Sequence, residues 1–288
     1  MSEPEPLSGL KEQEHSPQPQ AAPAPPGFER VRRLARRFLP SGLRKPLGSA
    51  AGWFSHGILQ PIQGAAFDLC GGRFRADGCT FVIPKDQTSR AYRSCFFDGS
   101  YEAEERAFVR AFVRPNDTVL ELGACLGIVS CVTNKILANK SKHVVVEGNP
   151  FCIPTIHRNR ELNQCGFLVE NCAVSNQRDA VFYLHPVYIV GGTTQRATAR
   201  AVRVPSRSLV DLNSRYGPFT VLIMDVEGSE LDLLEASTEA LAGYRLVIVE
   251  LHPWIIGDAS VERCRQILAD AGLRFQTQAL YTEVWTAV

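Results

Sequence analysis

The sequence contains no apolar run of the roughly 20 residues that a membrane-spanning helix needs; its longest apolar runs have the length of strands. It also lacks an apolar stretch close to its first residue, so we expect no secretory signal. The formal net charge is only +1, and bulk charge therefore gives no reason to expect a nucleic-acid partner. These absences lead us to expect a cytoplasmic protein that does not bind nucleic acid.

Cysteine pairs with metal-binding spacing are also missing. The nine cysteines are scattered, without a C-x-x-C motif, and their number is odd. Several lie in segments that we expect to be buried, so we predict reduced core thiols rather than a disulfide framework. The remaining composition is ordinary: 45% of the 288 residues are hydrophobic and 21% are charged, which suits one sizeable α/β domain with additional segments.

Two segments of different character precede this domain. Residues 1–27 are rich in Pro, Gln, Glu and Ala and have too few large apolar residues to offset the entropy of ordering, so we expect a disordered tail. Residues 28–65 begin with a basic amphipathic helix over 28–45 and continue as a connector. The basic helix has two explanations: docking on an anionic membrane surface or acidic partner, or packing on the main domain with a solvated arginine face.

The rest of the chain alternates between strand and helix patterns. Short alternating runs broken by glycine predict a small antiparallel β element over residues 66–98. From residue 99 to residue 288, β-rich runs are separated by helical patterns. The expected strands of this domain are 118–122, 143–146, 167–170, 181–184, 201–204, 221–224 and 246–249, followed by one or two strands in the tail. This alternation predicts an α/β fold with a mostly parallel central sheet and helices on both faces.

A glycine-containing turn follows the first strand of this domain, in the pattern Glu121-x-Gly123-x-x-x-Gly127. The glycines let the backbone approach a ligand, and the next helix start directs free N–H groups to the same place. Glu147 ends the second strand, 147 − 127 = 20 residues later, where a carboxylate can accept both hydroxyls of a ribose. Glu121 would repel a dinucleotide's pyrophosphate but can help to hold the cationic amino-acid end of S-adenosylmethionine. We therefore expect S-adenosylmethionine as the cofactor.

Other strands also end in carboxylates. Asp225 follows the strand 221–224, and Glu250 with nearby His252 follows the strand 246–249. Ligands of parallel sheets bind beyond the carboxyl ends of the strands. Because a buried carboxylate without a partner is costly, packing alone does not explain these residues, and we predict the functional site at this edge of the sheet.

Together these motifs resemble the FkbM-type family, a branch of the class I S-adenosylmethionine-dependent methyltransferases, from Gly99 to the C-terminus. The segments that carry the resemblance are Gly99-Ser-Tyr-Glu102, Leu120-Glu-Leu-Gly-Ala-Cys-Leu-Gly127, Glu147-Gly-Asn-Pro150, Asn159 with Asn163, Asn171-Cys-Ala-Val-Ser175, Ser208-Leu209 with Asp211-Leu212, Met224-Asp-Val-Glu-Gly-Ser-Glu230 and Glu250-Leu-His-Pro253. The chain departs from the family at Glu121, where Asp is more usual, and at Cys125-Leu-Gly-Ile128, where Asn-Ile-Gly-Tyr is usual.

The resemblance implies a Rossmann-like class I methyltransferase fold and methyl transfer to an oxygen, commonly a hydroxyl of a sugar, glycan or natural product. Such a hydroxyl needs a base or a metal to accept its proton. Asp225, over the expected methyl position, and His252 are the predicted catalytic residues. Asn171 and Ala173 follow the third strand, where an adenine edge would lie. The predicted cofactor contacts are Glu121, Gly123, Gly127, Glu147, Asn171, Ala173 and Asp225.

Several alternatives remain open. His252 is equally explained as a structural residue that braces the segment after it. Asp225, Glu227 and Glu230 offer oxygen ligands to a divalent metal, but the two glutamates also suit the positive end of the helix that follows, and we assign no metal site. The alternative to an enzyme is a non-catalytic scaffold that binds an adenosyl group and is recruited through the basic helix. We expect a small-molecule or glycan acceptor. Peripheral membrane contact through residues 28–45 is one of the two explanations of the basic helix, and the sequence does not indicate the oligomeric state.

Overall fold

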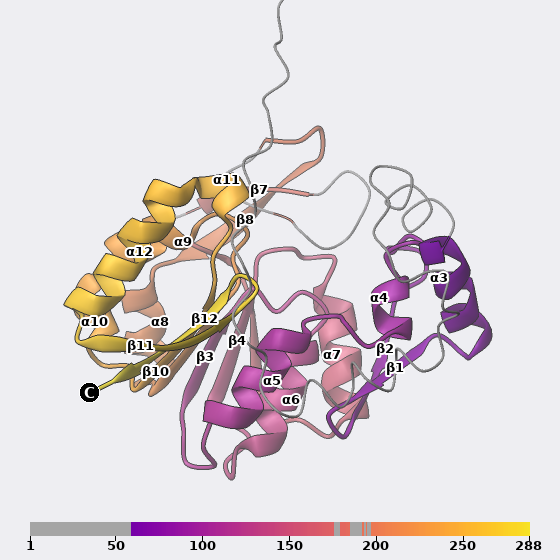
Figure 1. Ribbon diagram of the computed structural model, residues 1–288, viewed down its shortest axis with the longest axis horizontal. Coiled ribbons are helices and arrows are strands. Elements are labelled where there is room, and N and C mark those ends of the chain that lie inside the picture. The colour runs from indigo at the N-terminus through magenta and orange to yellow at the C-terminus, as the bar shows by residue number, and fades with distance from the viewer. Residues whose placement is uncertain (1–58, 176–178, 185–191, 193, 195–196) are drawn as a thin grey trace, which may run out of the picture. The chain divides into compact units, whose positions relative to one another are not determined.

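A seven-stranded sheet forms the centre of the structure, with the strand order β11-β12-β10-β9-β3-β4-β5. The strands are β3 (Val119–Leu122), β4 (His143–Glu147), β5 (Leu168–Asn171), β9 (Val221–Met224), β10 (Leu246–Glu250), β11 (Leu273–Ala279) and β12 (Thr282–Ala287). The first five are parallel, and β12 is antiparallel to both β10 and β11 (Figure 1). The predicted mostly parallel sheet is confirmed, and the tail forms its antiparallel edge.

The computed structural model describes residues 59–175, 179–184, 192, 194 and 197–288. They belong to one compact unit, Gly52–Val288. The expected tail and basic helix lie outside the described residues. Within the described part, every helix is too short or too polar to cross a bilayer.

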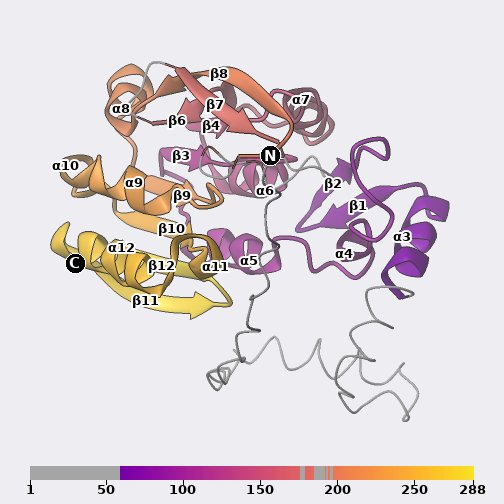
Figure 2. The same cartoon turned by 90° about the horizontal axis from the view of Figure 1, so that it is seen from above.

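Helices cover both faces of the sheet because its central strands are apolar on both sides. Residues at even and odd positions of β3 point to opposite faces, so Leu120 and Leu122 enter one core while Val119 enters the other. The core around Val119 is covered by α5 (Ala103–Phe112), α6 (Ile128–Ile136) and α7 (Ile153–Leu162). The opposite core is covered by α8 (Leu209–Tyr216), α9 (Glu230–Glu235), α10 (Thr238–Leu241) and α12 (Asp258–Asp270), and α11 (Pro253–Ile256) precedes α12 (Figure 2).

Helix α8 is an element that the sequence patterns did not predict. Its local signal is a capping box, in which the Ser208 hydroxyl accepts the N–H of Asp211 and the Asp211 carboxylate accepts the N–H of Ser208. The apolar residues Leu209 and Leu212 then point into the core. A second, three-stranded sheet precedes this helix in the sequence. Its strands lie side by side in the order β6 (Ala173–Val174), β8 (Ala201–Arg207) and β7 (Asp179–Tyr183).

The segment before the main domain contains two short helices and a hairpin. They are α3 (Gln60–Leu69), β1 (Arg73–Ala76), β2 (Cys79–Val82) and α4 (Ser94–Phe97). The predicted antiparallel β element is thus a hairpin, and its Asp77-Gly78 turn has positive φ at both residues, as two-residue hairpin turns require. Residues 67–69, which we expected in a strand, instead end α3, because only Phe67 of this run is buried.

Side-chain amides of α7 join this hairpin to the main domain. Asn163 accepts the N–H of Thr80 at 2.8 Å and donates to the carbonyl of Thr80 at 2.8 Å. One helical turn earlier, Asn159 accepts the N–H of Val82 at 2.8 Å and donates to the carbonyl of Leu126 at 2.9 Å. The two asparagines therefore satisfy the edge of β2 in place of a third strand.

We expect Asn159→Ala to lower the free energy of unfolding by about 2–4 kcal/mol, because it leaves two buried backbone groups without partners. Asn159 is fully buried, with 0% of its surface exposed. Urea unfolding followed by circular dichroism measures the change. The matched control is His157→Ala on the exposed face of the same helix, and an equal loss in both variants would contradict the role of the amide.

Candidate functional site

A cavity of about 420 Å³ lies at the carboxyl ends of the central strands. This volume is typical of small-molecule sites, which span roughly 300–1,000 Å³. Five of the predicted cofactor contacts and catalytic residues line it together: Gly123, Glu147, Ala173, Asp225 and His252. They end or closely follow β3, β4, β5, β9 and β10, with Ala173 beginning β6 two residues after β5, so parallel strands bring residues far apart in the sequence to one place.

Three other predicted contacts do not line the cavity. Glu121 is buried on the face of the sheet that α6 covers, where its carboxylate accepts the hydroxyl of Ser130 and lies 3.0 Å from Nε2 of His143. Gly127 caps the start of α6 with φ +72°. Asn171 donates to the carbonyl of Glu147 at 2.8 Å. The geometry gives all three a supporting role behind the wall of the cavity.

Gly123 permits a close backbone approach at the cavity. Its φ is +88°, and a Cβ built there would lie 1.6 Å from the carbonyl oxygen of Asp225. Its N–H donates to the carbonyl of Val146 at 2.9 Å. Any side chain at this position would therefore separate the ends of β3 and β9.

Glu147 presents a buried carboxylate held by the backbone. Its Oε2 accepts the N–H of Cys125 at 2.7 Å, and its Oε1 accepts the N–H of Asn149 at 2.6 Å. Burial raises the pKa of Glu147 to about 7, although these backbone N–H groups oppose the shift. The side chain is thus fixed in place, and its charge changes near neutral pH.

Glu102 is a cavity residue to which the sequence analysis gave no role, although it lies in a segment that carries the family resemblance. Its backbone is left-handed, with φ +47°, and its buried Oε2 has no hydrogen-bond partner among the described residues. Burial raises its pKa to about 8. The sequence signal was the acidic residue itself; the unusual φ that turns it into the cavity depends on packing.

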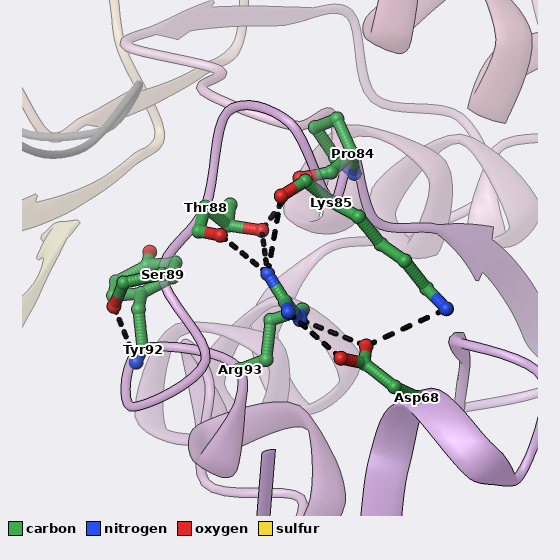
Figure 3. Close-up of polar contacts among 7 residues, drawn as sticks. All are labelled: Asp68, Pro84, Lys85, Thr88, Ser89, Tyr92 and Arg93. Carbon is green, nitrogen blue, oxygen red and sulfur yellow. Dashed lines mark hydrogen bonds and ion pairs between the residues drawn. The ribbon is translucent and has the colours of Figure 1, made fainter. Parts of the chain in front are cut away.

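The segment before α5 also gives the cavity an aromatic wall. Tyr92 and Tyr101 line it, with ring centroids 6.2 Å apart, and the hydroxyl of Tyr101 donates to Sγ of Cys125 at 3.3 Å. Figure 3 shows what holds this segment in place: the guanidinium of Arg93 makes two hydrogen bonds to Asp68 of α3, at 2.8 and 2.9 Å. The same guanidinium donates to backbone carbonyls of the preceding loop. Arg93 therefore fixes the position of its neighbour Tyr92.

His252 occupies the other end of the cavity among carboxylates. Its Nδ1 lies 2.6 Å from Oε1 of Glu230, which also accepts the N–H of Gly228 at 2.9 Å. Its Nε2 faces Asp225 at 3.6 Å and Glu227 at 3.7 Å. Burial lowers the pKa of His252, but the Glu230 hydrogen bond and the surrounding carboxylates outweigh burial and raise it to about 9.

The carboxylates of this corner also affect one another. Burial and the neighbouring charges of Glu250 and Glu227 raise the pKa of Asp225 well above its usual range. The pKa of Glu105, from α5, is raised by burial and by Asp225. We call the group of Asp225, Glu227, Glu250, His252 and Glu105 the acidic corner. The acidic corner has a strongly negative electrostatic potential, and its titratable groups readily hold and exchange protons.

Comparison with known proteins identifies one family that matches the chain. The family model described as "Methyltransferase FkbM domain" matches residues 121–275. No curated protein is significantly similar to the chain.

Three solved structures align with much of this chain. Precorrin-6y C5,15-methyltransferase from Geobacter metallireducens aligns with a TM-score of 0.44 and 9% identity, covering 72% of this chain and 94% of its own. A methyltransferase from Pyrococcus furiosus aligns with a TM-score of 0.43 and 13% identity, covering 82% and 100%. Aeropyrum pernix fibrillarin, solved with S-adenosyl-L-methionine, aligns with a TM-score of 0.39 and 11% identity, covering 64% and 73%.

The residues present fit S-adenosylmethionine. Glu147 offers a fixed, ionisable carboxylate to ribose hydroxyls, and the turn at Gly123 brings backbone to the cavity without a side chain. Glu102, rather than Glu121, places an unpartnered carboxylate oxygen at the cavity for a cationic group. Ala173 adds a small apolar side chain.

We expect Glu147→Ala to weaken binding of S-adenosylhomocysteine, and we expect the affinity of the unchanged chain to depend on pH. Ribose hydroxyls donate to the ionised carboxylate, so affinity should fall by up to about tenfold per pH unit below the pKa and level off above it. That pKa is about 7. Isothermal titration between about pH 5.5 and 8.5 measures the effect.

The fall in affinity centred near pH 7 should disappear in Glu147→Ala, whereas any contribution from Glu102, whose pKa is about 8, should remain. Glu161→Ala, at an exposed position of α7, is the control and should behave like the unchanged chain. A pH-independent affinity in the unchanged chain would show that Glu147 does not contact the ribose.

Proposed function

Because the chain belongs to the FkbM methyltransferase family, whose domain model covers 155 of its 288 residues (275 − 121 + 1), we propose that it methylates a hydroxyl oxygen of a sugar, glycan or natural-product small molecule. Its cofactor is S-adenosylmethionine. When bound, this cofactor supplies a methyl group on a positively charged sulfur, which an acceptor oxygen can take. The finer part of the proposal is the oxygen acceptor, and it depends on the residues of the acidic corner.

The observation that carries the proposal is the placement of His252 and Asp225 in the same cavity as Glu147. A hydroxyl has a pKa far above neutral and must lose its proton as it is methylated. Nδ1 of His252 is held by Glu230, while its Nε2 and the carboxylate of Asp225 face the cavity. In its deprotonated form, either Nε2 of His252 or the carboxylate of Asp225 provides a place for the acceptor's proton at the opposite end from the Glu147 carboxylate.

The aromatic wall supports a sugar or ring-shaped acceptor. Tyr92, Tyr101 and Phe182 line the cavity and offer flat apolar faces, while the acidic corner offers hydrogen-bond acceptors for hydroxyl groups. Such a combination suits a polyhydroxylated molecule with apolar C–H faces. We place the reaction in a reducing, cytoplasmic setting, which the nine free cysteines support. Membrane contact through residues 28–45 stays a prediction.

The alternative is a scaffold that binds an adenosyl group without catalysis. The presence of Gly123, Glu147 and Asp225 in one cavity favours the enzyme. A direct test incubates the full chain with methyl-labelled S-adenosylmethionine and small-molecule extracts, and identifies labelled products by mass spectrometry and NMR. An O-methyl product supports the proposal; an N- or C-methyl product contradicts the oxygen acceptor; binding of S-adenosylhomocysteine without any product favours the scaffold.

We expect Asp225→Asn to keep the affinity for S-adenosylhomocysteine within a few-fold and to lower the single-turnover rate by about 100-fold, the contribution typical of a proton-transfer group. The amide has nearly the same shape but cannot hold the acceptor's proton. Asp270→Asn, at an exposed position of α12, is the matched control. Equal rates in the two variants would remove Asp225 from the catalytic residues.

A further inference from the structure

The acidic corner has more negative groups than its protein partners can balance. Asp225, Glu227 and Glu250 line one end of the cavity, and Glu105 lies directly behind two of them. Among the described residues that line the cavity, His252 alone is basic. Buried carboxylates gathered in this way are unfavourable unless a cation or hydrogen-bond donors compensate them.

The spacing of the polar atoms is that of ligands around one ion. Nε2 of His252 lies 3.6 Å from Oδ1 of Asp225, 3.7 Å from Oε2 of Glu227 and 3.9 Å from Oε1 of Glu250. These separations exceed the roughly 2.7–3.2 Å of a hydrogen bond. Atoms that each lie about 2.1 Å from a shared divalent metal are separated by roughly 3 to 4 Å. Ligand atoms of Asp225, Glu227 and His252 all lie within 4.8 Å of one another.

Buried groups without partners point independently to a ligand here. Oδ1 of Asp225 is buried and has no hydrogen-bond partner among the described residues. Glu105 is only 4% exposed, and the structure shows no hydrogen bond or ion pair to it from the described part of the chain. Its carboxylate lies within 4.8 Å of those of Asp225 and Glu250. Oδ1 of Asp225 therefore faces the corner as a buried oxygen without a hydrogen bond, and the carboxylate of Glu105 lies beside it.

The orientation of His252 matches that of a metal ligand. The ring is 3% exposed, and its Nδ1 is held at 2.6 Å by Glu230, which is itself fully buried. In metal sites a carboxylate commonly holds one ring nitrogen so that the other faces the ion. Glu230, which the sequence analysis considered together with Asp225 and Glu227 as a ligand, thus lies behind the imidazole as a positioning residue.

We propose that Asp225, Glu227 and His252 bind one divalent metal ion at the acidic corner of the cavity. Carboxylate oxygens with one imidazole nitrogen form a donor set suited to a first-row divalent ion such as Mn²⁺. The ion's charge would favour the deprotonated form of an acceptor hydroxyl, and only this role rests on the proposed function. The proposal departs from the sequence analysis, which assigned no metal.

The test titrates Mn²⁺ alone into the metal-free full chain, without cofactor, by isothermal calorimetry. We expect one ion per chain, and an affinity at least tenfold lower in Glu227→Gln and in Glu230→Gln. We expect Glu227→Gln to leave the fold intact because the side chain of Glu227 is 33% exposed. Glu161→Gln, at an exposed acid of α7, is the control and should bind Mn²⁺ as the unchanged chain does.

Two results would overturn the proposal: no saturable Mn²⁺ binding by the unchanged, folded chain, or equal affinity in Glu227→Gln. The first result would leave His252 as a protonated imidazole that balances the carboxylates without a metal, and the second would place the bound ion away from Glu227. The outcome is separate from that of the proposed function. O-methylation by EDTA-treated protein would keep the function and remove the metal, whereas Mn²⁺ binding together with an N-methyl product would do the reverse.

Discussion

The ends of strands β3 and β9 approach so closely that no side chain fits between them. A Cβ at Gly123 would lie 1.6 Å from the carbonyl oxygen of Asp225. This contact fixes Asp225 relative to the turn after β3, and two residues further along the turn the N–H of Cys125 reaches Glu147. One stretch of backbone therefore sets the distance between the carboxylates of Glu147 and Asp225 at the two ends of the cavity.

The carboxylates buried at this edge of the sheet lose their contact with water, and this loss is compensated in three different ways. Glu121 is satisfied by Ser130 and His143 behind the sheet. Glu147 is satisfied by backbone N–H groups and so keeps its oxygens aligned with the cavity. The carboxylates around His252 have only that imidazole among the described residues lining the cavity, which is why a cation is the physical complement that the corner requires.

Part of the cavity wall comes from residues that precede the part of the chain matched by the family model. Tyr92, Tyr101 and Glu102 lie before residue 121, and the ion pair between Arg93 and Asp68 holds their segment against α3. The segment before the matched region therefore contributes to the same cavity as the strand ends inside that region.

The sequence by itself determined the α/β order, the parallel sheet and the meeting of Gly123, Glu147 and His252 at one edge, because strand periodicity and strand direction are local properties that parallel pairing converts into proximity. It did not determine which acid faces the cavity. Glu121 turned away into the core behind the sheet, and Glu102 turned inward on a left-handed backbone. Only the tertiary structure decided this, because the direction of a side chain depends on the partners that packing brings to it.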